Sequence, residues 1–203
     1  MIKSLQISFI ILLFWSCAES QNKPIGGPCE GCEAVYEYGN KALKAIDTIP
    51  GFKESSNKIK ISGTVYKSDG KTPAKDVILY IYQTNEKGRY PSKADSKGWE
   101  RRHGYMRTWL KTDAKGKYTF YTSRPASYPN STIPQHIHIT VKEPDKNEYY
   151  IEDFFFSDDP LLPTNIKNRS KPRGGKGVIT LAGNGPIKQA QRDIILGLHI
   201  PGY

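Results

Sequence analysis

From Lys58 onward the chain alternates apolar and polar residues, and this constrains its fold more than any other feature. A period of two is typical of strands that turn one face to a core. The runs are short and end in turns rich in Gly, Pro and Asp, such as Asp69-Gly70. The sequence therefore predicts an all-β sandwich. Strands are expected around residues 59–65, 77–82, 118–122, 133–141, 149–156 and 178–181, with an irregular loop over 157–176.

The N-terminal part of the 203-residue chain has a different composition. Residues 1–16 include an apolar run that is too short for a bilayer span and looks like a signal peptide. Residues 17–57 are expected to be a tether and N-terminal segment, with one short helix over 33–46, and residues 58–203 the sandwich domain. This gives three predicted parts.

The end of the apolar run, Leu13-Phe14-Trp15-Ser16-Cys17, resembles the lipobox of bacterial lipoproteins. Trp15 is bulky for that motif, and an ordinary cleaved signal is the alternative. The resemblance implies an exported protein of the bacterial cell envelope, held at the membrane by a lipid on Cys17.

Two further cysteines, Cys29 and Cys32, are separated by two residues. In an exported protein this spacing favours a small structural disulfide. A redox pair and half of a zinc site are the competing interpretations. A zinc site lacks a second Cys pair or nearby His, and a thioredoxin-like site would need a βαβ pattern.

The formal net charge of +10 gives a basic protein. Its Lys and Arg residues are scattered along the chain, and no nucleic-acid-binding motif is present, so we expect no nucleic-acid partner. A basic surface can concentrate anionic aromatic compounds. The sequence carries no signature of an oligomeric state.

The run Gln135-His136-Ile137-His138 places two histidines in a predicted strand. Residues two apart lie on one face of a strand, about 6.5 to 7 Å apart at Cα, so both imidazoles can reach one metal ion. A pair of partly exposed histidines without a metal is the alternative.

Two tyrosines, Tyr90 and Tyr128, each precede a proline next to turn residues. The proline holds the tyrosine extended, and such a position can direct a phenol into a cleft. A phenol with a pKa of about 10 becomes a phenolate at neutral pH only on a strongly acidic metal. Zinc and ferrous iron prefer imidazole with thiolate or carboxylate, so two Tyr with two His indicate Fe(III). For any single tyrosine, a packed aromatic with a bonded hydroxyl is the alternative.

The ordered set of motifs resembles the intradiol ring-cleavage dioxygenases, which include catechol, protocatechuate and hydroxyquinol dioxygenases. The resemblance lies in the whole set, because no single motif is specific. Its motifs are Gly63-Thr64-Val65, Asp69-Gly70, Gly88-Arg89-Tyr90, Thr112-Asp113-Ala114, Arg124-Pro125, Tyr128-Pro129, Pro134, His136-Ile137-His138 and Asp158-Asp159-Pro160-Leu161.

This resemblance implies that Tyr90, Tyr128, His136 and His138 bind Fe(III). The implied reaction uses O₂ to open a catechol-type aromatic diol between its two hydroxylated carbons, giving a muconate-type product. Tyr90 and Tyr128 would be the catalytic tyrosines, with Tyr128 leaving the metal and accepting a substrate proton. The implied partners are the diol, O₂ and the membrane.

Two positions depart from the family pattern. Ile133 stands where the family usually has a substrate-binding Arg, and Asp153 falls at the position of a family Gln. A missing cation beside developing negative charge costs on the order of 10²-fold in rate. Arg124, Arg101, Arg102 and Arg107 are the candidate replacements, so Ile133, Asp153 and Arg124 are expected at the substrate pocket.

These departures leave a second hypothesis open: an envelope-anchored binding protein for catecholic compounds that keeps the metal site and catalyses little. A third, a purely structural transthyretin-like or surface-display sandwich, requires the histidine pair and both Tyr-Pro turns to be coincidental.

Overall fold

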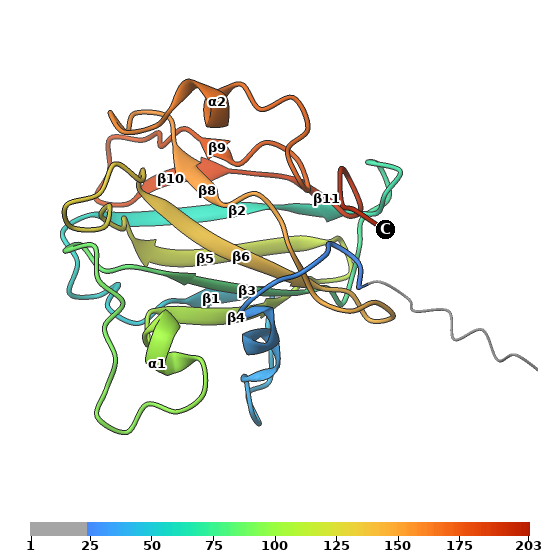
Figure 1. Ribbon diagram of the computed structural model, residues 1–203, viewed down its shortest axis with the longest axis horizontal. Coiled ribbons are helices and arrows are strands. Elements are labelled where there is room, and N and C mark those ends of the chain that lie inside the picture. The colour runs from blue at the N-terminus through green and yellow to red at the C-terminus, as the bar shows by residue number, and fades with distance from the viewer. Residues whose placement is uncertain (1–23) are drawn as a thin grey trace, which may run out of the picture.

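The computed structural model describes residues 24–203, which form two β-sheets packed against each other (Figure 1). The first sheet has β11 (Ile194–Ile195) paired with β2 and the order β1 (Ile46–Thr48), β5 (Lys117–Ser123), β2 (Lys58–Tyr66), β10 (Lys188–Gln191). The second has β7 (Tyr149–Tyr150) paired with β6 and the order β4 (Arg107–Lys111), β3 (Ile78–Gln83), β6 (His136–Lys142), β8 (Phe154–Phe156), β9 (Val178–Ile179). The predicted all-β sandwich is confirmed.

The core lies between the two sheets, where the apolar residues that alternate along their strands pack together. Ile59 and Ile61 of β2 are at most 2% exposed, and they belong to the same buried cluster as Ile137 and Ile139 of β6. The residues that alternate with them along β6, including His136 and His138, therefore lie on the outer face of the second sheet. This outer face carries the candidate site.

The N-terminal segment covers part of the same outer face. The helix expected over 33–46 is wrong in extent: a 3₁₀ helix, η1 (Cys32–Tyr36), ends early, and the chain then enters β1. Val35 of η1 is fully buried beside Tyr80, and Trp109 donates a hydrogen bond from Nε1 to Ala34 O. The segment expected to precede the sandwich thus adds β1 to the first sheet and packs η1 on the outer face of the second.

Several other element boundaries differ from the sequence prediction. The strand expected over 149–156 is split into β7 and β8, and the loop expected over 157–176 contains a short helix, α2 (Thr164–Lys167). The sequence also gave no signal for β4 or for the one-turn helix α1 (Glu100–His103). Such short elements are held by tertiary contacts more than by their own propensity.

Cys29 and Cys32 form a disulfide, which closes a small loop just before η1. The predicted signal segment and Cys17 lie outside the described residues. Within residues 24–203, no helix is long and apolar enough to cross a membrane.

Candidate metal centre

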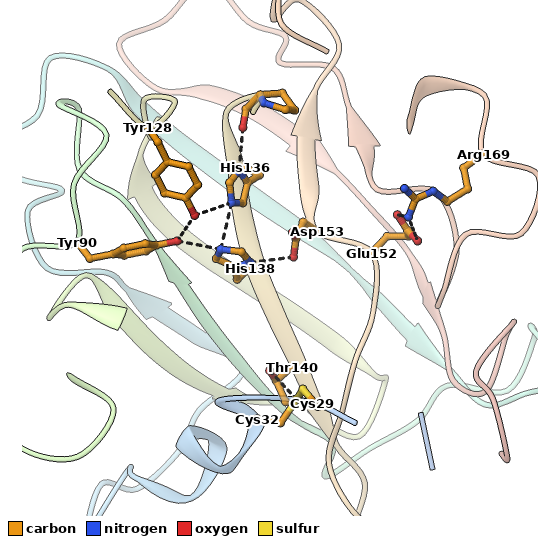
Figure 2. A network of polar contacts seen from close by, with 11 residues as sticks. Cys29, Cys32, Tyr90, Tyr128, His136, His138, Thr140, Glu152, Asp153 and Arg169 are labelled. Atoms are coloured by element: carbon orange, nitrogen blue, oxygen red, sulfur yellow. Dashed lines mark hydrogen bonds and ion pairs between the residues drawn. A yellow bond between two sulfur atoms is a disulfide. The ribbon is translucent and has the colours of Figure 1, made fainter. Parts of the chain in front are cut away.

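Four side chains converge at the start of β6 (Figure 2). His136 and His138 project from the same face of this strand, and their Nε2 atoms are 3.1 Å apart. Tyr90 and Tyr128 reach them from two loops, with their hydroxyl oxygens 2.7 Å apart. Tyr90 Oη lies 2.9 Å from His138 Nε2, and Tyr128 Oη lies 3.2 Å from His136 Nε2.

Hydrogen bonds join the loop that carries Tyr90 to the loop that carries Tyr128. Thr84 Oγ1 donates a hydrogen bond to Ala126 O, and Ala126 N donates to Asn85 O. Gly88, with φ of +70°, lies so close to Ser127 that a Cβ atom would be 1.9 Å from its carbonyl oxygen. Only glycine allows this approach, which brings the loop of Tyr90 against the loop of Tyr128.

The donor atoms fit a single metal ion. With metal–ligand distances of about 2.0 to 2.2 Å, neighbouring ligand atoms lie about 3 Å apart. The four separations described among these Oη and Nε2 atoms run from 2.7 to 3.2 Å, which matches that spacing. Two phenols and two imidazoles form a donor set suited to a hard trivalent ion such as Fe(III), because only a strongly acidic metal keeps a phenol ionised at neutral pH.

Both imidazoles are oriented by a partner on their far nitrogen. His136 Nδ1 lies 2.7 Å from Pro134 O, a carbonyl that can only accept, so Nδ1 carries the proton. His138 Nδ1 lies 3.2 Å from Asp153 Oδ1. Both Nε2 lone pairs are consequently left free for a metal, an arrangement common around metal-bound histidines.

Burial controls the protonation of these ligands. Burial lowers the pKa of His136, with a further contribution from neighbouring His138, so the imidazole stays neutral and able to bind a metal. Burial also raises the pKa of Tyr90, and the hydrogen bond with Tyr128 adds to this effect. Without a strongly acidic metal, Tyr90 remains a protonated phenol.

Two adjoining cavities open beside the donor atoms and share Glu30, Tyr82 and His138. One, of about 250 Å³, is lined by Tyr90, Tyr128 and His138, together with Trp99, Arg102 and His103. The other, of about 270 Å³, extends past Asp153 under the disulfide loop. We refer to the two cavities together as the cleft.

Comparison with known proteins identifies the family. A family profile described as Dioxygenase matches residues 36–179. The β chain of protocatechuate 3,4-dioxygenase from Burkholderia cepacia is 30% identical over 137 residues, which is 62% of this chain. The chain belongs to the intradiol dioxygenase family. It spans 58% of the length of that relative.

Solved structures of intradiol dioxygenases share the fold. The dioxygenase domain of a Streptomyces dioxygenase carbohydrate-binding protein fusion has a TM-score of 0.56 at 19% identity, covering 79% of this chain and 94% of that chain. Catechol 1,2-dioxygenase from Acinetobacter has a TM-score of 0.54 at 18% identity, covering 75% and 57%. 3-Chlorocatechol 1,2-dioxygenase from Rhodococcus opacus has a TM-score of 0.57 at 18% identity, covering 86% and 73%.

The substrate-pocket residues expected from the intradiol dioxygenase pattern are dispersed in the structure. Ile133 is 48% exposed and lines neither cavity of the cleft. Arg124 forms a bidentate ion pair with Asp158, a hydrogen bond with Gln135 Oε1, and part of a separate cavity. Asp153 lines the cleft as expected, at the far side of His138.

Three cleft residues that lie far apart along the chain carry no signal in the sequence: Glu30, Tyr82 and Trp99. Tyr82 pairs with His138 across β3 and β6, and their rings stack with centroids 4.4 Å apart. His103 stacks on the other face of Tyr82 at 3.9 Å. No motif marks these residues, since their roles depend on strand register and loop packing.

Proposed function

We propose that this protein is an Fe(III)-dependent intradiol dioxygenase, which uses O₂ to cleave a catechol-type aromatic to a muconate-type product. One observation carries the proposal: two phenol oxygens and two imidazole nitrogens lie within metal-sharing distance beside a cleft. Membership of the intradiol dioxygenase family supports the same reaction class.

In this proposal Tyr90, Tyr128, His136 and His138 hold the iron. A bound ferric ion supplies the Lewis acidity that activates a diol toward O₂. Asp153 and Pro134 keep the two histidine rings oriented through their Nδ1 atoms. Tyr90, Tyr128 and His138 border the cleft, which allows a diol to approach the donor atoms from that side.

Tyr128 is the residue proposed to accept a substrate proton. Its hydroxyl lies 2.7 Å from that of Tyr90 and 3.2 Å from His136 Nε2. Burial raises the pKa of the Tyr128 phenol, so a phenolate at this position would be a strong base for a diol hydroxyl.

The test is a visible spectrum of the iron-loaded protein. We expect a tyrosinate-to-iron absorption band that shifts when catechol is added, because the diol changes the set of ligands. Tyr90→Phe removes one phenolate and should abolish most of the band. Tyr36→Phe is the control, because Tyr36 bonds Glu148 and lines neither cavity. A colourless protein that binds zinc, or no metal, contradicts the proposal.

A second candidate function is supported by the position of Ile133. Neither Ile133 nor Arg124 provides a cation in the cleft; of the four candidate replacements Arg102 alone lines it, and that side chain is 62% exposed and paired with Glu30. The protein would then bind catecholic compounds at the metal and catalyse little. Oxygen uptake with a set of catechols separates the two functions, since rapid uptake with formation of muconate excludes the second.

A further inference from the structure

Two opposite charges stand together in the cleft beside the donor atoms. Glu30 and Arg102 line the same cavity as Tyr90, Tyr128 and His138. Arg102 Nη1 donates to Glu30 Oε1, and the two side chains are 62% and 71% exposed. An ion pair this exposed is weak and can exchange its partners for those of a ligand.

Packing and the disulfide restrict the positions of Glu30 and Arg102. Glu30 lies inside the loop closed by the Cys29–Cys32 disulfide. Next to it, Gly31 has φ of +85°, and a Cβ atom there would lie 2.8 Å from the ring of His103. Arg102 lies over the ring of Trp99, 5.3 Å from its centroid. The loop of Glu30 and the side chain of Arg102 are therefore both held in place at the cleft.

The charge pattern of the cleft is defined by this pair. Among the described residues that line its two cavities, Arg102 is the one Lys or Arg side chain, and the carboxylates are Glu30 and Asp153. Asp153 is already bonded to His138. Glu30 also lies before residues 36–179, the part matched by the family profile, so this wall of the cleft is contributed from outside the matched region.

A singly charged substituent is poorly matched to this pair. An ammonium group is attracted by Glu30 and repelled by Arg102, while a carboxylate experiences the reverse, so the two effects largely cancel. A substituent with both charges satisfies each partner at once. Charge complementarity of this kind provides selectivity more than raw affinity.

We propose that Glu30 and Arg102 select catechols with a zwitterionic side chain, whose ammonium group binds Glu30 and whose carboxylate binds Arg102. The inference rests on the proposed function, because it takes the diol to be held at the four donor atoms. Glu30 and Arg102 then determine specificity at the opposite end of the substrate.

The test compares four catechols with the same ring attachment: dihydroxyphenylalanine (zwitterion), dopamine (cation), dihydroxyphenylpropionate (anion) and ethylcatechol (neutral). Their dissociation constants are measured by calorimetry with the full iron-loaded protein in the absence of O₂. We expect the zwitterion to bind up to about fivefold more tightly than either singly charged catechol, the scale of one exposed ion pair.

Two substitutions should shift selectivity in opposite directions. Glu30→Gln is expected to favour the anionic catechol over the cationic one by about threefold to fivefold, and Arg102→Gln the cationic over the anionic by a similar factor. Either substitution should remove the preference for the zwitterion. Glu33→Gln and Arg101→Gln are matched controls, because each makes the same charge change close by without lining the cleft.

The outcomes separate this inference from the proposed function. Equal affinities for the four catechols, or the same response in the controls, overturn the inference, while oxygen uptake with ethylcatechol still supports the dioxygenase. Charge-dependent binding without cleavage of any catechol supports the inference and argues against the proposed enzyme. A protein that binds none of the four overturns both.

Discussion

Asp153 contacts His138 at Nδ1, the ring nitrogen that faces away from the other three candidate ligands. Its Oδ1 accepts the hydrogen bond from His138 Nδ1 at 3.2 Å. Burial alone would raise the pKa of this carboxyl, but the electrostatic interaction and the hydrogen bond with His138 lower the pKa overall. An ionised Asp153 therefore fixes the ring of His138 and makes Nε2 a better ligand.

Asp153→Asn should weaken iron binding by about tenfold, because loss of such a partner typically costs 10- to 100-fold in metal affinity and the amide oxygen can still accept the hydrogen bond. Competition with a chelator of known affinity measures the change. Asp145→Asn is the control, since Asp145 is an exposed carboxylate outside the cleft. Unchanged iron affinity in Asp153→Asn would show that the carboxylate has no supporting role.

Strand β2 joins the core to the C-terminal tail of the chain. It pairs with β5 on one side and with β10 and β11 on the other, so the tail closes the first sheet. Between β10 and β11, Arg192 N donates to Ser62 O, and Tyr118 Oη donates to Arg192 O. A Cβ atom on Gly63 would lie 1.8 Å from the same Arg192 oxygen, so only glycine fits this crossing.

Gly63→Ala is expected to destabilise the protein by about 3 kcal/mol, the upper part of the usual range for overpacking, because the obstructing atom belongs to the backbone. The free energy of unfolding in urea measures the loss. Gly185→Ala makes the same chemical change at an exposed position where a Cβ meets no atom within 4 Å, and should change stability little. Equal stability of the two variants would contradict the tight crossing.

Packing of the N-terminal segment onto the second sheet makes the stability of the whole molecule sensitive to acid. His103 is 7% exposed beneath this segment, and its Nδ1 lies 2.9 Å from the hydroxyl of Tyr80. Burial lowers the pKa of His103 from its ordinary value to about 4, with smaller contributions from the charges of His138 and Arg107. Folding therefore favours the neutral imidazole.

The unfolded chain takes up a proton at His103 near pH 6.5, while the folded protein resists it until about pH 4. The neutral His103 therefore stabilises the fold fully above about pH 6.5, and this contribution is lost as the pH falls toward about 4. We expect the melting temperature of the metal-free protein to fall across this window, and less steeply in His103→Gln. The exposed His199→Asn is the control, and an equal slope in His103→Gln would contradict the assignment.

Much of the fold was predictable because it depends on local patterns. Period-two alternation identified β2, β3, β5 and β6, since the apolar face of each strand must meet the core. The tail and the Tyr149–Phe156 region were less predictable, because β7, β8, β10 and β11 have at most four residues each and depend on partner strands. The early end of η1 likewise depends on its packing against Tyr80 and Trp109.

By itself the sequence determined the donor set: two histidines with strand spacing and two tyrosines held by prolines, in an order typical of intradiol dioxygenases. Spacing along a strand fixes which side chains share a face, so this information is local. The tertiary structure alone decided that these donors meet and that Tyr82 stacks on His138. It also decided that Glu30 faces Arg102 across 72 residues of chain, because register and loop packing are properties of the whole fold.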